Sequence, residues 1–447
     1  MRMPTPGPKV EEVLSRIDHG RVTAILFSDH IRPSVAGRYY HWEEIRRRRP
    51  PEDFSAEEWW FGIKMARSQV RRFLPLTDTD GQAFSYVLTD EALSMLQQID
   101  QQAAGSVQMP EVVATPASRD RYIVAGLIEE AINSSLLEGA VTTRREAKDL
   151  LREGRAPRTI DERMVVNNYR TMHELREDSK TPLTVEGVLE IHRVVTEGTL
   201  QPAEEAGRLQ QPGEKRVFVS GPDPNEIYHR PPPARELPER MQMMVTFANA
   251  VDDRAFVHPV VRAIALHFYL AYVHPFVDGN GRTARALFYR TLLRHGYWLA
   301  EFLSISRLLR QAPVQYQRAF LYTETDDGDF TYFLLHQLQV LCRAIEDLFE
   351  TLEQKVAEVR QVERALRRQP GLNGRQMALL SHALRNLDAI YTIEGHRSSH
   401  RIAYQTARTD LLDLERRGFL QTHRAGRKFR FFPVVEALEQ LGPDRRS

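Results

Sequence analysis

The sequence predicts a mainly α-helical protein, because helical patterns cover most of it and strand patterns are confined to two patches. Apolar residues recur at helical spacing over long stretches, of which the clearest are 119–137, 161–179, 184–197 and 330–368. Alternating residues flank turn signals at 215–230 and 419–432. We therefore expect a helical core that carries a β-hairpin, an N-terminal helical region, and a C-terminal module in which helices precede a hairpin.

Composition places the chain among ordinary globular proteins. Its 447 residues are 42% hydrophobic and 27% charged, which suits two or three domains with cores of their own. A formal net charge of +1 leaves no global basic field that would argue for nucleic acid. The single cysteine, Cys342, excludes an intramolecular disulfide and suits a reducing compartment. No apolar stretch approaches the roughly 20 residues of a membrane span, so we expect a cytoplasmic protein without membrane attachment.

Turn signals divide the chain into four parts. The expected parts are an N-terminal region at 1–110, a catalytic region at 111–345, a connecting helix at 346–369 and the C-terminal module at 370–447. The clearest boundary is Gln369-Pro370-Gly371, where a long helical pattern stops. The N-terminal region carries helical signals, among them a capping box that begins at Ser55, but no recognisable chemistry.

The most informative segment is a twelve-residue motif between two apolar helical segments. It reads His274-Pro-Phe-Val-Asp-Gly-Asn-Gly-Arg-Thr-Ala-Arg285, and the flanking helices are expected at 259–272 and 282–295. The glycines of Gly279-Asn280-Gly281 let backbone N–H groups turn toward a ligand, and the dipole of the following helix adds positive potential. The motif is therefore expected to form an anion-binding nest at a helix N-terminus.

The side chains of the motif suit the chemistry of phosphate groups. Arg282 and Arg285 lie three residues apart, so both are expected to face one side of the helix and grip a polyphosphate. Asp278 is a hard oxygen ligand suited to Mg²⁺ when phosphates supply the other oxygens. Histidine titrates near neutrality, so His274 can take a proton from an attacking hydroxyl. Asn280 is expected to fix a phosphate oxygen or the loop itself.

With these residues in place, the motif resembles the signature of the Fic family, His-x-Phe-x-(Asp/Glu)-Gly-Asn-Gly-Arg-x-x-Arg, without a gap or a substitution. The resemblance implies a protein adenylyltransferase that moves the AMP part of ATP, with Mg²⁺, onto a Ser, Thr or Tyr hydroxyl of a target protein. It implies that His274 is the catalytic base, that Asp278 holds the metal, and that Arg285 holds the γ-phosphate. The nest formed by Gly279, Asn280 and Gly281, together with Arg282, would then stabilise charge on the transferring and leaving groups.

A second segment, Ser134-Ser-Leu-Leu-Glu138-Gly139, resembles the inhibitory motif of the same family, (Ser/Thr)-x-x-x-Glu-(Gly/Asn). It ends the helix expected at 119–138, and Ser134 and Glu138 share one face of that helix because they are four residues apart. The resemblance implies that Glu138 reaches Arg285 and occupies the place of the ATP γ-phosphate. A motif that precedes the signature indicates the subclass with an N-terminal, intramolecular inhibitory helix.

The patch at 215–230 predicts a β-hairpin, since two short β-type runs flank a turn rich in Gly, Pro and Asn. The resemblance implies that this hairpin is the Fic flap, whose exposed edge holds the target segment by main-chain pairing. A plain surface hairpin is the alternative. Candidates for contact with the adenine base are Tyr316 and, on the hairpin, Tyr228 and His229.

Residues 374–435 resemble a winged helix-turn-helix, because two helical segments precede a basic hairpin. Such modules bind DNA or dock protein. The helix expected at 406–417 carries Asp410, Asp413 and Glu415 among its arginines, and these carboxylates would face or flank phosphates in a groove. The sequence therefore allows DNA as a partner but favours docking of a protein or positioning of a homo-oligomer.

Three functions remain open at this point. The first is the adenylyltransferase. The second is removal of AMP from a modified protein, with Glu138 positioning a water molecule. The third is a DNA-binding regulator whose Fic core senses a nucleotide, although the intact His274 favours an enzyme because a sensor needs no base.

Overall fold

A computed structural model describes residues 2–51, 53–104, 116–220, 227–250, 256–368, 371–385, 389–425 and 428–439. The chain divides into two compact units, of which the first comprises residues 1–107 and 125–345 and the second comprises residues 108–124 and 346–447. The first unit contains the motifs of the candidate site. The second contains the C-terminal module.

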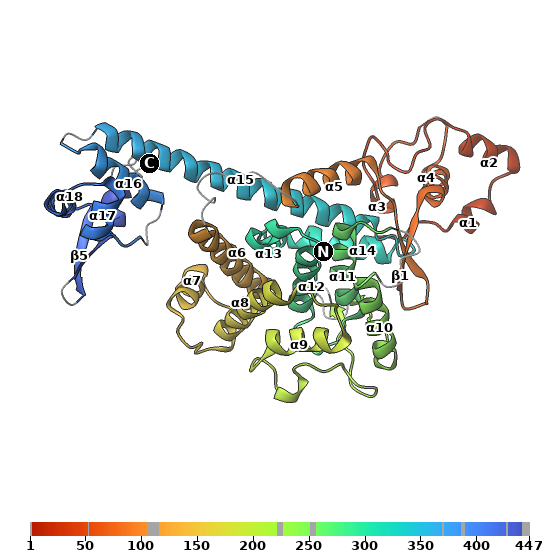
Figure 1. The fold of residues 1–447 in the computed structure, drawn as a ribbon. Helices are drawn as coiled ribbons and strands as arrows, with labels where there is room; N and C mark the ends of the chain where they lie inside the picture. Colours follow the sequence, from red (N-terminus) through yellow and green to blue (C-terminus); the bar gives the residue numbers. More distant parts are fainter. Residues whose placement is uncertain are drawn as a thin grey trace. The chain divides into compact units, whose positions relative to one another are not determined.

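Helices account for most of the first unit (Figure 1). Its α-helices, of which α6 and α15 continue into the second unit, are α1 Val10–Leu14, α2 His19–Leu26, α3 Trp42–Ile45, α4 Ala56–Val70, α5 Asp90–Ala103, α6 Pro116–Leu137, α7 Arg144–Glu153, α8 Ile160–Asp178, α9 Val185–Thr196, α10 Leu237–Ala248, α11 Pro259–Val273, α12 Asn280–Arg294, α13 Ile305–Gln311, α14 Pro313–Glu324 and α15 Thr331–Arg368. Short 3-10 helices are η2 Ala203–Glu205, η3 Ala234–Glu236 and η4 Trp298–Phe302. Two antiparallel hairpins complete the unit, β1 Arg72–Thr77 with β2 Ala83–Tyr86, and β3 Val219–Ser220 with β4 Ile227–His229. The predicted fold class, mainly helical with small hairpins, is confirmed.

The core of the first unit is built around α11 and α12, which pack against each other (Figure 1). Pro259 starts α11 at a position where its missing N–H costs nothing, and the His258 ring accepts a hydrogen bond from the N–H of Val260. α11 is buried on almost every side, as its apolar sequence predicts. The junction between the two helices, residues 274–279, is therefore held at both ends by buried structure.

The N-terminal region has a hydrophobic cluster of its own, which includes Trp59, Trp60 and Ile63 of α4. The capping box predicted at Ser55 is confirmed at the start of α4. Ser55 Oγ accepts from the N–H of Glu58 at 3.1 Å, and Glu58 Oε2 accepts from the N–H of Ser55 at 2.7 Å.

The β1–β2 hairpin was missed by the sequence analysis, which expected helices and turns in this region. The signal is present: Leu74 and Leu76 are buried whereas Phe73 is exposed, which is the period of two of a strand. Asp80-Gly81 is a common hairpin turn, and Gly81 has the left-handed φ of 80° that such a turn requires. Pro75 argued against a strand, but each strand of a two-stranded sheet is an edge strand, where proline is tolerated.

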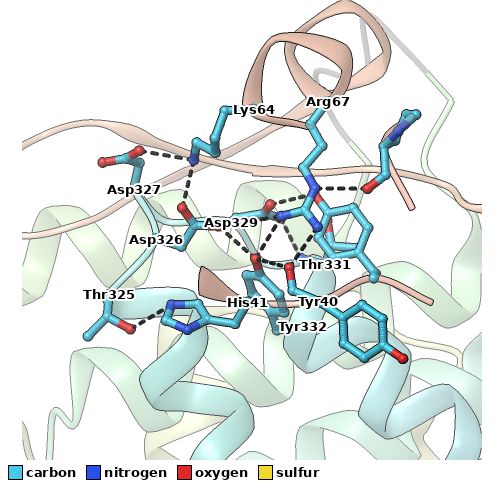
Figure 2. A network of polar contacts seen from close by, with 12 residues as sticks. Tyr40, His41, Lys64, Arg67, Thr325, Asp326, Asp327, Asp329, Thr331 and Tyr332 are labelled. Atoms are coloured by element: carbon cyan, nitrogen blue, oxygen red, sulfur yellow. Dashed lines mark hydrogen bonds and ion pairs between the residues drawn. The ribbon is translucent and has the colours of Figure 1, made fainter. Parts of the chain in front are cut away.

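A network of buried charges joins the N-terminal region to the loop between α14 and α15 (Figure 2). Lys64 Nζ lies 2.7 Å from Asp326 Oδ1, and Arg67 Nη1 lies 3.7 Å from Asp326 Oδ2. Arg67 also donates to the Tyr332 hydroxyl at 2.8 Å and to the backbone carbonyl of Tyr40. Burial acts to raise the pKa of Asp326, yet Lys64 and Arg67 hold it below its ordinary value. The buried carboxylate therefore depends on cations from α4.

The second unit has a core of its own. Its elements are α16 Gly374–Arg385, α17 Ile393–His400, α18 Tyr404–Arg416, the antiparallel strands β5 Leu420–Ala425 and β6 Lys428–Pro433, and α19 Val435–Glu439. An isolated β-bridge joins Tyr391 to Phe431. Buried apolar side chains from α16, α17, α18 and the hairpin form a single cluster. α18 starts two residues before the expected segment 406–417.

In the part of the chain that the structure describes, no helix combines the length and the apolar character needed to cross a bilayer.

Candidate functional site

The last carbonyl groups of α11 have partners that place the side chains of the site. A helix leaves its final carbonyl oxygens without helical donors, and each buried one requires another partner. Here Ala271 O accepts from His274 Nδ1 at 3.2 Å, Tyr272 O from His229 Nε2 at 2.6 Å, and Val273 O from Arg216 Nη2 at 2.8 Å. The end of α11 thus orients His274 and ties down the β3–β4 segment at the same time.

His274 is held in the tautomer that a general base needs. Pro275 has no N–H, so the Ala271 carbonyl lacks its ordinary donor four residues on and accepts from His274 Nδ1 instead. A carbonyl oxygen only accepts, so Nδ1 carries the hydrogen and Nε2 keeps its lone pair. Burial lowers the pKa of His274 to about 4. The ring is therefore neutral at physiological pH, with one nitrogen ready to take up a proton.

The loop that follows His274 is closed by the Asn280 side chain. Asn280 Oδ1 accepts from the N–H of Phe276 at 3.0 Å, and Nδ2 donates to the Phe276 carbonyl at 2.9 Å. Gly279 precedes α12 with a φ of 81°, and a Cβ at this position would collide with Thr196 of α9. Of the two roles considered for Asn280, the structure gives it that of fixing the loop.

α12 begins at Asn280, two residues before the expected start, and its N-terminus points unpaired donors into the site. The first helical hydrogen bond here runs from the N–H of Thr283 to the Gly279 carbonyl at 3.0 Å. The N–H groups of Asn280, Gly281 and Arg282 therefore have no helical acceptor. No side chain caps this end of the helix. Three adjacent donors at the positive end of the helix dipole make a favourable position for an anion.

Asp278 lies at the exposed side of the junction, with its side chain 58% accessible to solvent. Its Oδ1 accepts from the N–H of Gly279 at 2.6 Å, and its Oδ2 lies 3.4 Å from Arg282 Nη2. Its backbone carbonyl accepts from His192 Nε2 of α9 at 2.9 Å. The Asp278 carboxylate thus faces solvent beside Arg282, while the hydrogen bond from His192 fixes the Asp278 backbone.

His192 is a site residue that sequence analysis missed. Its ring stacks on Phe276 with 3.7 Å between ring centroids, and its Nδ1 accepts from the N–H of Gly207 at 2.9 Å. Burial lowers its pKa to about 4, so the neutral ring has one donor and one acceptor, and both are used. His192 lies in α9, far from the motif in sequence, so no local pattern indicated its role.

The two arginines of the motif are both buried but point to different helices. Arg282 Nη1 donates to the Val195 carbonyl of α9 at 3.0 Å. Its buried Nε has no hydrogen-bond acceptor among the residues that the structure describes. Arg285 donates to α6 through all three of its nitrogens: Nε to Ser134 Oγ at 2.9 Å, Nη2 to the Ser134 carbonyl at 3.1 Å, and Nη1 to Glu138 Oε1 at 2.9 Å. The structure therefore places the predicted pair Ser134 and Glu138 against Arg285.

The Glu138 carboxylate also covers the N-terminus of α12. A Cβ on Gly281 would overlap the Glu138 carboxylate, so a larger residue there would displace that carboxylate from this position. The Arg285 side chain is 2% exposed and that of Glu138 is 25% exposed, so the pair is largely shielded from water. Glu138 therefore occupies the favourable position for an anion that the α12 N-terminus creates.

Two further residues of α6 fix the helix in this position. Glu130 is buried and accepts from Ser304 Oγ at 3.0 Å and from the N–H of Ser306 at 3.1 Å. Burial raises the pKa of Glu130, although the Ser306 hydroxyl counteracts it. Gly126 lets α6 approach the backbone of Phe302, which a Cβ would strike. Neither residue was predicted, because both act through segments distant in sequence.

The hairpin predicted at 215–230 is present in part as β3 and β4, with Val219 opposite His229. Residues 221–226 of the predicted turn lie outside the described residues. His229 is buried, with Nε2 at 2.6 Å from the Tyr272 carbonyl oxygen and Nδ1 at 2.7 Å from Glu324 Oε2 of α14. Tyr228 is buried as well. His229 thus anchors β4 to α11 and α14.

Tyr316, the other candidate for contact with adenine, packs among aromatic residues of α14 and α15. Its hydroxyl lies 2.8 Å from His267 Nε2, and its ring meets Phe320 and Phe333. Burial raises the pKa of Tyr316, and the Arg285 guanidinium opposes that change. Tyr316 is therefore a buried core residue, close enough to Arg285 for the guanidinium to influence the pKa of its hydroxyl.

The fit to a metal ion depends on Asp278 alone. Among the described residues, no group of three or more His, Cys, Asp or Glu side chains is arranged to hold a metal. One exposed carboxylate next to a helix N-terminus suits Mg²⁺, which keeps several waters and takes phosphate oxygens as ligands. The residues present therefore fit Mg²⁺ that arrives with a polyphosphate, and do not fit a metal held by protein ligands only.

Comparison with known sequences identifies the region around this site. Residues 182–292 match the model of the family described as Fic/DOC. The protein adenylyltransferase Fic of Drosophila melanogaster is 36% identical over 118 residues, which cover 26% of this chain and 21% of that protein. The enzyme of the same name from Nematostella vectensis is 37% identical over 115 residues, covering 26% of this chain and 24% of that protein. The chain thus spans about a quarter or less of the curated relatives that it matches.

Comparison of structures extends the likeness beyond the motif. The crystal structure of a Fic family protein from Desulfovibrio desulfuricans aligns with 78% of this chain and 97% of its own, with a TM-score of 0.50. The two sequences are 18% identical, so the likeness is one of fold.

Proposed function

The chain carries a Fic domain that includes residues 182–292, and from this premise we propose that it is a protein adenylyltransferase. It transfers AMP from ATP to a Ser, Thr or Tyr hydroxyl of a target protein. The observation that carries this proposal is the junction between α11 and α12. There a neutral histidine with a free Nε2 stands beside a helix N-terminus whose N–H groups lack helical acceptors.

In the proposed reaction the target hydroxyl attacks the α-phosphorus of ATP. The bond from that oxygen to phosphorus forms as the bond to the oxygen bridging the α- and β-phosphates breaks, and the hydroxyl proton passes to His274 Nε2. Pyrophosphate leaves. The unpaired N–H groups of Asn280 and Gly281 and the free Nε–H of Arg282 stabilise the negative charge that develops on the phosphates.

Mg²⁺, when bound, supplies positive charge to the phosphate oxygens, and Asp278 is the residue that would hold it. The hydrogen bond from His192 to the Asp278 backbone keeps this carboxylate at the edge of the anion site. Loss of His192 would loosen Asp278 without touching the nucleotide directly.

Glu138 is proposed as an intramolecular inhibitor. Its carboxylate pairs with Arg285 and covers Gly281, which is the position that the γ-phosphate of ATP requires. Two anions cannot share one buried guanidinium without a large electrostatic cost. ATP therefore binds in a productive position only when Glu138 leaves Arg285.

The β3–β4 hairpin is proposed to hold the target segment by main-chain pairing, as an edge strand can. His229 and Arg216 anchor the hairpin to the α11 carbonyls next to His274. The end of α11 therefore carries both the contact that orients His274 and the contacts that anchor the hairpin, which favours a fixed distance between the base and the target hydroxyl.

A labelling experiment tests the proposal. The purified chain and its Glu138→Gly variant are incubated with Mg²⁺ and ATP labelled at either the α- or the γ-phosphate. We expect protein-bound label from α-labelled ATP and none from γ-labelled ATP. Label from the γ-position would indicate a kinase instead, and absence of label from both, in the presence of a lysate as a source of targets, would contradict the proposal.

A further inference from the structure

The order of elements in the second unit places a helix-turn-helix before a hairpin. α17 and α18 are separated by three residues, Arg401 to Ala403, and Arg401 ends α17 in the left-handed conformation with a φ of 53°. Turns of three to four residues join the helices of DNA-binding helix-turn-helix motifs. The β5–β6 hairpin follows α18, and the bridge from Tyr391 to Phe431 adds a third chain segment to it. This arrangement leaves one side of α18 for the core and the other for solvent.

The buried side of α18 is apolar. Ala407, Leu411 and Leu414 recur at helical spacing and belong to the core that α16, α17 and the hairpin share. The opposite side is polar and exposed, and it carries Gln405, Arg408, Thr409 and Arg416. α18 therefore presents to solvent a row of side chains that can hydrogen-bond to phosphates and to base edges.

Two of the three acidic residues of α18, Asp410 and Asp413, have partners on α16. Asp410 is buried and lies 2.8 Å from Arg375 Nε and 3.2 Å from His396 Nε2. These partners and Asn373 hold its pKa below the ordinary value, although burial acts to raise it. Asp413 accepts from Gln376 of α16 at 3.0 Å and is paired with Arg416 at 2.7 Å and with Arg417 at 2.8 Å. The sequence analysis expected Asp410, Asp413 and Glu415 to face or flank phosphates, whereas the structure gives Asp410 and Asp413 partners on α16.

Two exposed arginines form no ion pair with any residue that the structure describes. Arg401, between the helices, and Arg408, in the first turns of α18, are both exposed, and the structure shows no ion pair for either among the described residues. Tyr404 and Gln405 lie between them in sequence and are exposed as well. Residues 371–439 as a whole contain eleven Arg and Lys against seven Asp and Glu. The positive charge of the unit is thus left free where α17 meets α18.

We propose that this surface, formed by Arg401, Tyr404, Gln405, Arg408 and Thr409, binds duplex DNA. A helix of the size of α18 fits the major groove, and the N-terminal residues of such a helix reach base edges while flanking arginines contact phosphates. The proposal goes beyond the proposed transfer of AMP, which takes place in the other unit and does not depend on it. The cations Arg401 and Arg408, beside exposed amide and hydroxyl groups and with Asp410 and Asp413 bound by α16, favour a polyanion over a protein as occupant.

Fluorescence anisotropy of the full chain tests this surface. The probe is a labelled 30-base-pair duplex of random sequence, titrated at several salt concentrations from 50 to 200 mM. We expect binding that weakens with salt, because each neutralised phosphate releases counterions. The double variant Arg401→Asn with Arg408→Ala, in which asparagine tolerates the left-handed position, should bind about tenfold or more weakly at 100 mM salt. The slope of log affinity against log salt should become about 1.8 units shallower, since each lost phosphate contact contributes roughly 0.9.

A matched control removes two arginines elsewhere. Arg16→Ala with Arg32→Ala takes away two exposed arginines of the first unit, whose side chains are 60% and 67% exposed, and should leave DNA binding unchanged. Self-labelling by ATP should be equal in the wild type and both double variants, so loss of DNA binding is separated from loss of the transferase or of the fold. Absence of duplex binding by the full chain at 50 mM salt would overturn the proposal and point to a protein partner. Binding with an unchanged slope in the Arg401/Arg408 variant would overturn it too.

Discussion

Glu138 Oε1 accepts a hydrogen bond from Arg285 Nη1 at 2.9 Å, across 147 residues of sequence. The pair closes the N-terminus of α12 from the side of α6, and Ser134 holds the other two nitrogens of the same guanidinium. One N–H group on each of the three nitrogens of Arg285 therefore has its acceptor in Ser134 or Glu138. Under the proposed function, the position of α6 decides whether the anion site is open.

Replacing the proposed base should abolish transfer and leave nucleotide binding. His274→Ala is expected to lower the rate of labelling on the order of 10²–10⁴-fold, because a general base acts in the transition state and contributes little to ground-state affinity. The readout is labelling from α-labelled ATP beside ATP affinity by calorimetry, both in the Glu138→Gly background. His173→Ala, which removes an exposed histidine of α8, is the control and should label normally. Normal labelling by His274→Ala would refute the mechanism.

Removing the inhibitory carboxylate should raise labelling. Glu138→Gly frees Arg285 for the γ-phosphate, and a charged hydrogen bond is worth about 1.5–3 kcal/mol, so we expect a gain on the order of tenfold to a hundredfold. Adding Arg285→Ala should cancel the gain. Glu129→Ala removes a carboxylate from the same helix that pairs with Arg144 instead, and should change nothing. Equal labelling by wild type and Glu138→Gly would rule out inhibition, and loss of an AMP-removing activity in this variant would indicate that Glu138 positions a water molecule.

The buried charge network should be necessary for the stability of the first unit. Arg67→Met leaves Asp326 buried with fewer counter-charges, so we expect a loss of about 3–5 kcal/mol in the free energy of unfolding. The exposed pair of Arg16 and Glu57 provides the contrast, since Arg16→Ala should cost at most about 1 kcal/mol. Urea unfolding monitored by tryptophan fluorescence compares the two. A similar small loss in both variants would mean that the network contributes no more than a surface pair.

Acid should destabilise the fold through buried neutral histidines. Burial lowers the pKa of His41 and His192 from 6.5 to about 4, so below pH 6.5 the unfolded chain takes up protons that the folded chain does not. Stability is therefore lost as pH falls from about 6.5 to 4, by up to roughly 1.4 kcal/mol per pH unit for each such histidine. Unfolding curves between pH 7.5 and 5 measure the slope. His192→Gln keeps one donor and one acceptor without titrating, and should make the slope shallower; an unchanged slope would contradict the assignment.

How far the sequence predicts the site depends on how local each interaction is. The residues from His274 to Arg285 hold the α11–α12 junction by contacts within a few residues, such as that of Asn280 with Phe276. The structure of this junction could therefore be predicted from the sequence. The approach of Glu138 to Arg285 was expected from a family resemblance rather than from spacing. The support from His192 and Arg216 was not predicted, because it arises where α9 and the β3 segment meet the end of α11.

When charged residues occur on two faces of a helix, the sequence also does not show which of them face the core and which face solvent. In α18 the order of residues shows acids and arginines intermixed, which suggests that the charges cancel. Packing against α16 gives Asp410 and Asp413 partners in Arg375 and Gln376, and Asp413 also pairs with Arg416 and Arg417, so that Arg408 is left without an ion pair among the described residues. The β1–β2 hairpin was missed for a different reason, since β1 contains Pro75, which weakens its strand pattern although Asp80-Gly81 supplies a turn signal.

Lys64 and Arg67 of α4, which pair with Asp326, limit where this protein can be truncated or joined to another one. The segment that matches the Fic/DOC model ends at residue 292, yet the loop that follows α14 carries a buried carboxylate whose counter-ions lie more than 250 residues upstream. A fragment or a chimera that begins after residue 110 would lack both cations and leave that carboxylate without its counter-charges. A chimera should therefore keep the N-terminal region and the segment up to α15 together, as one exchangeable block rather than two.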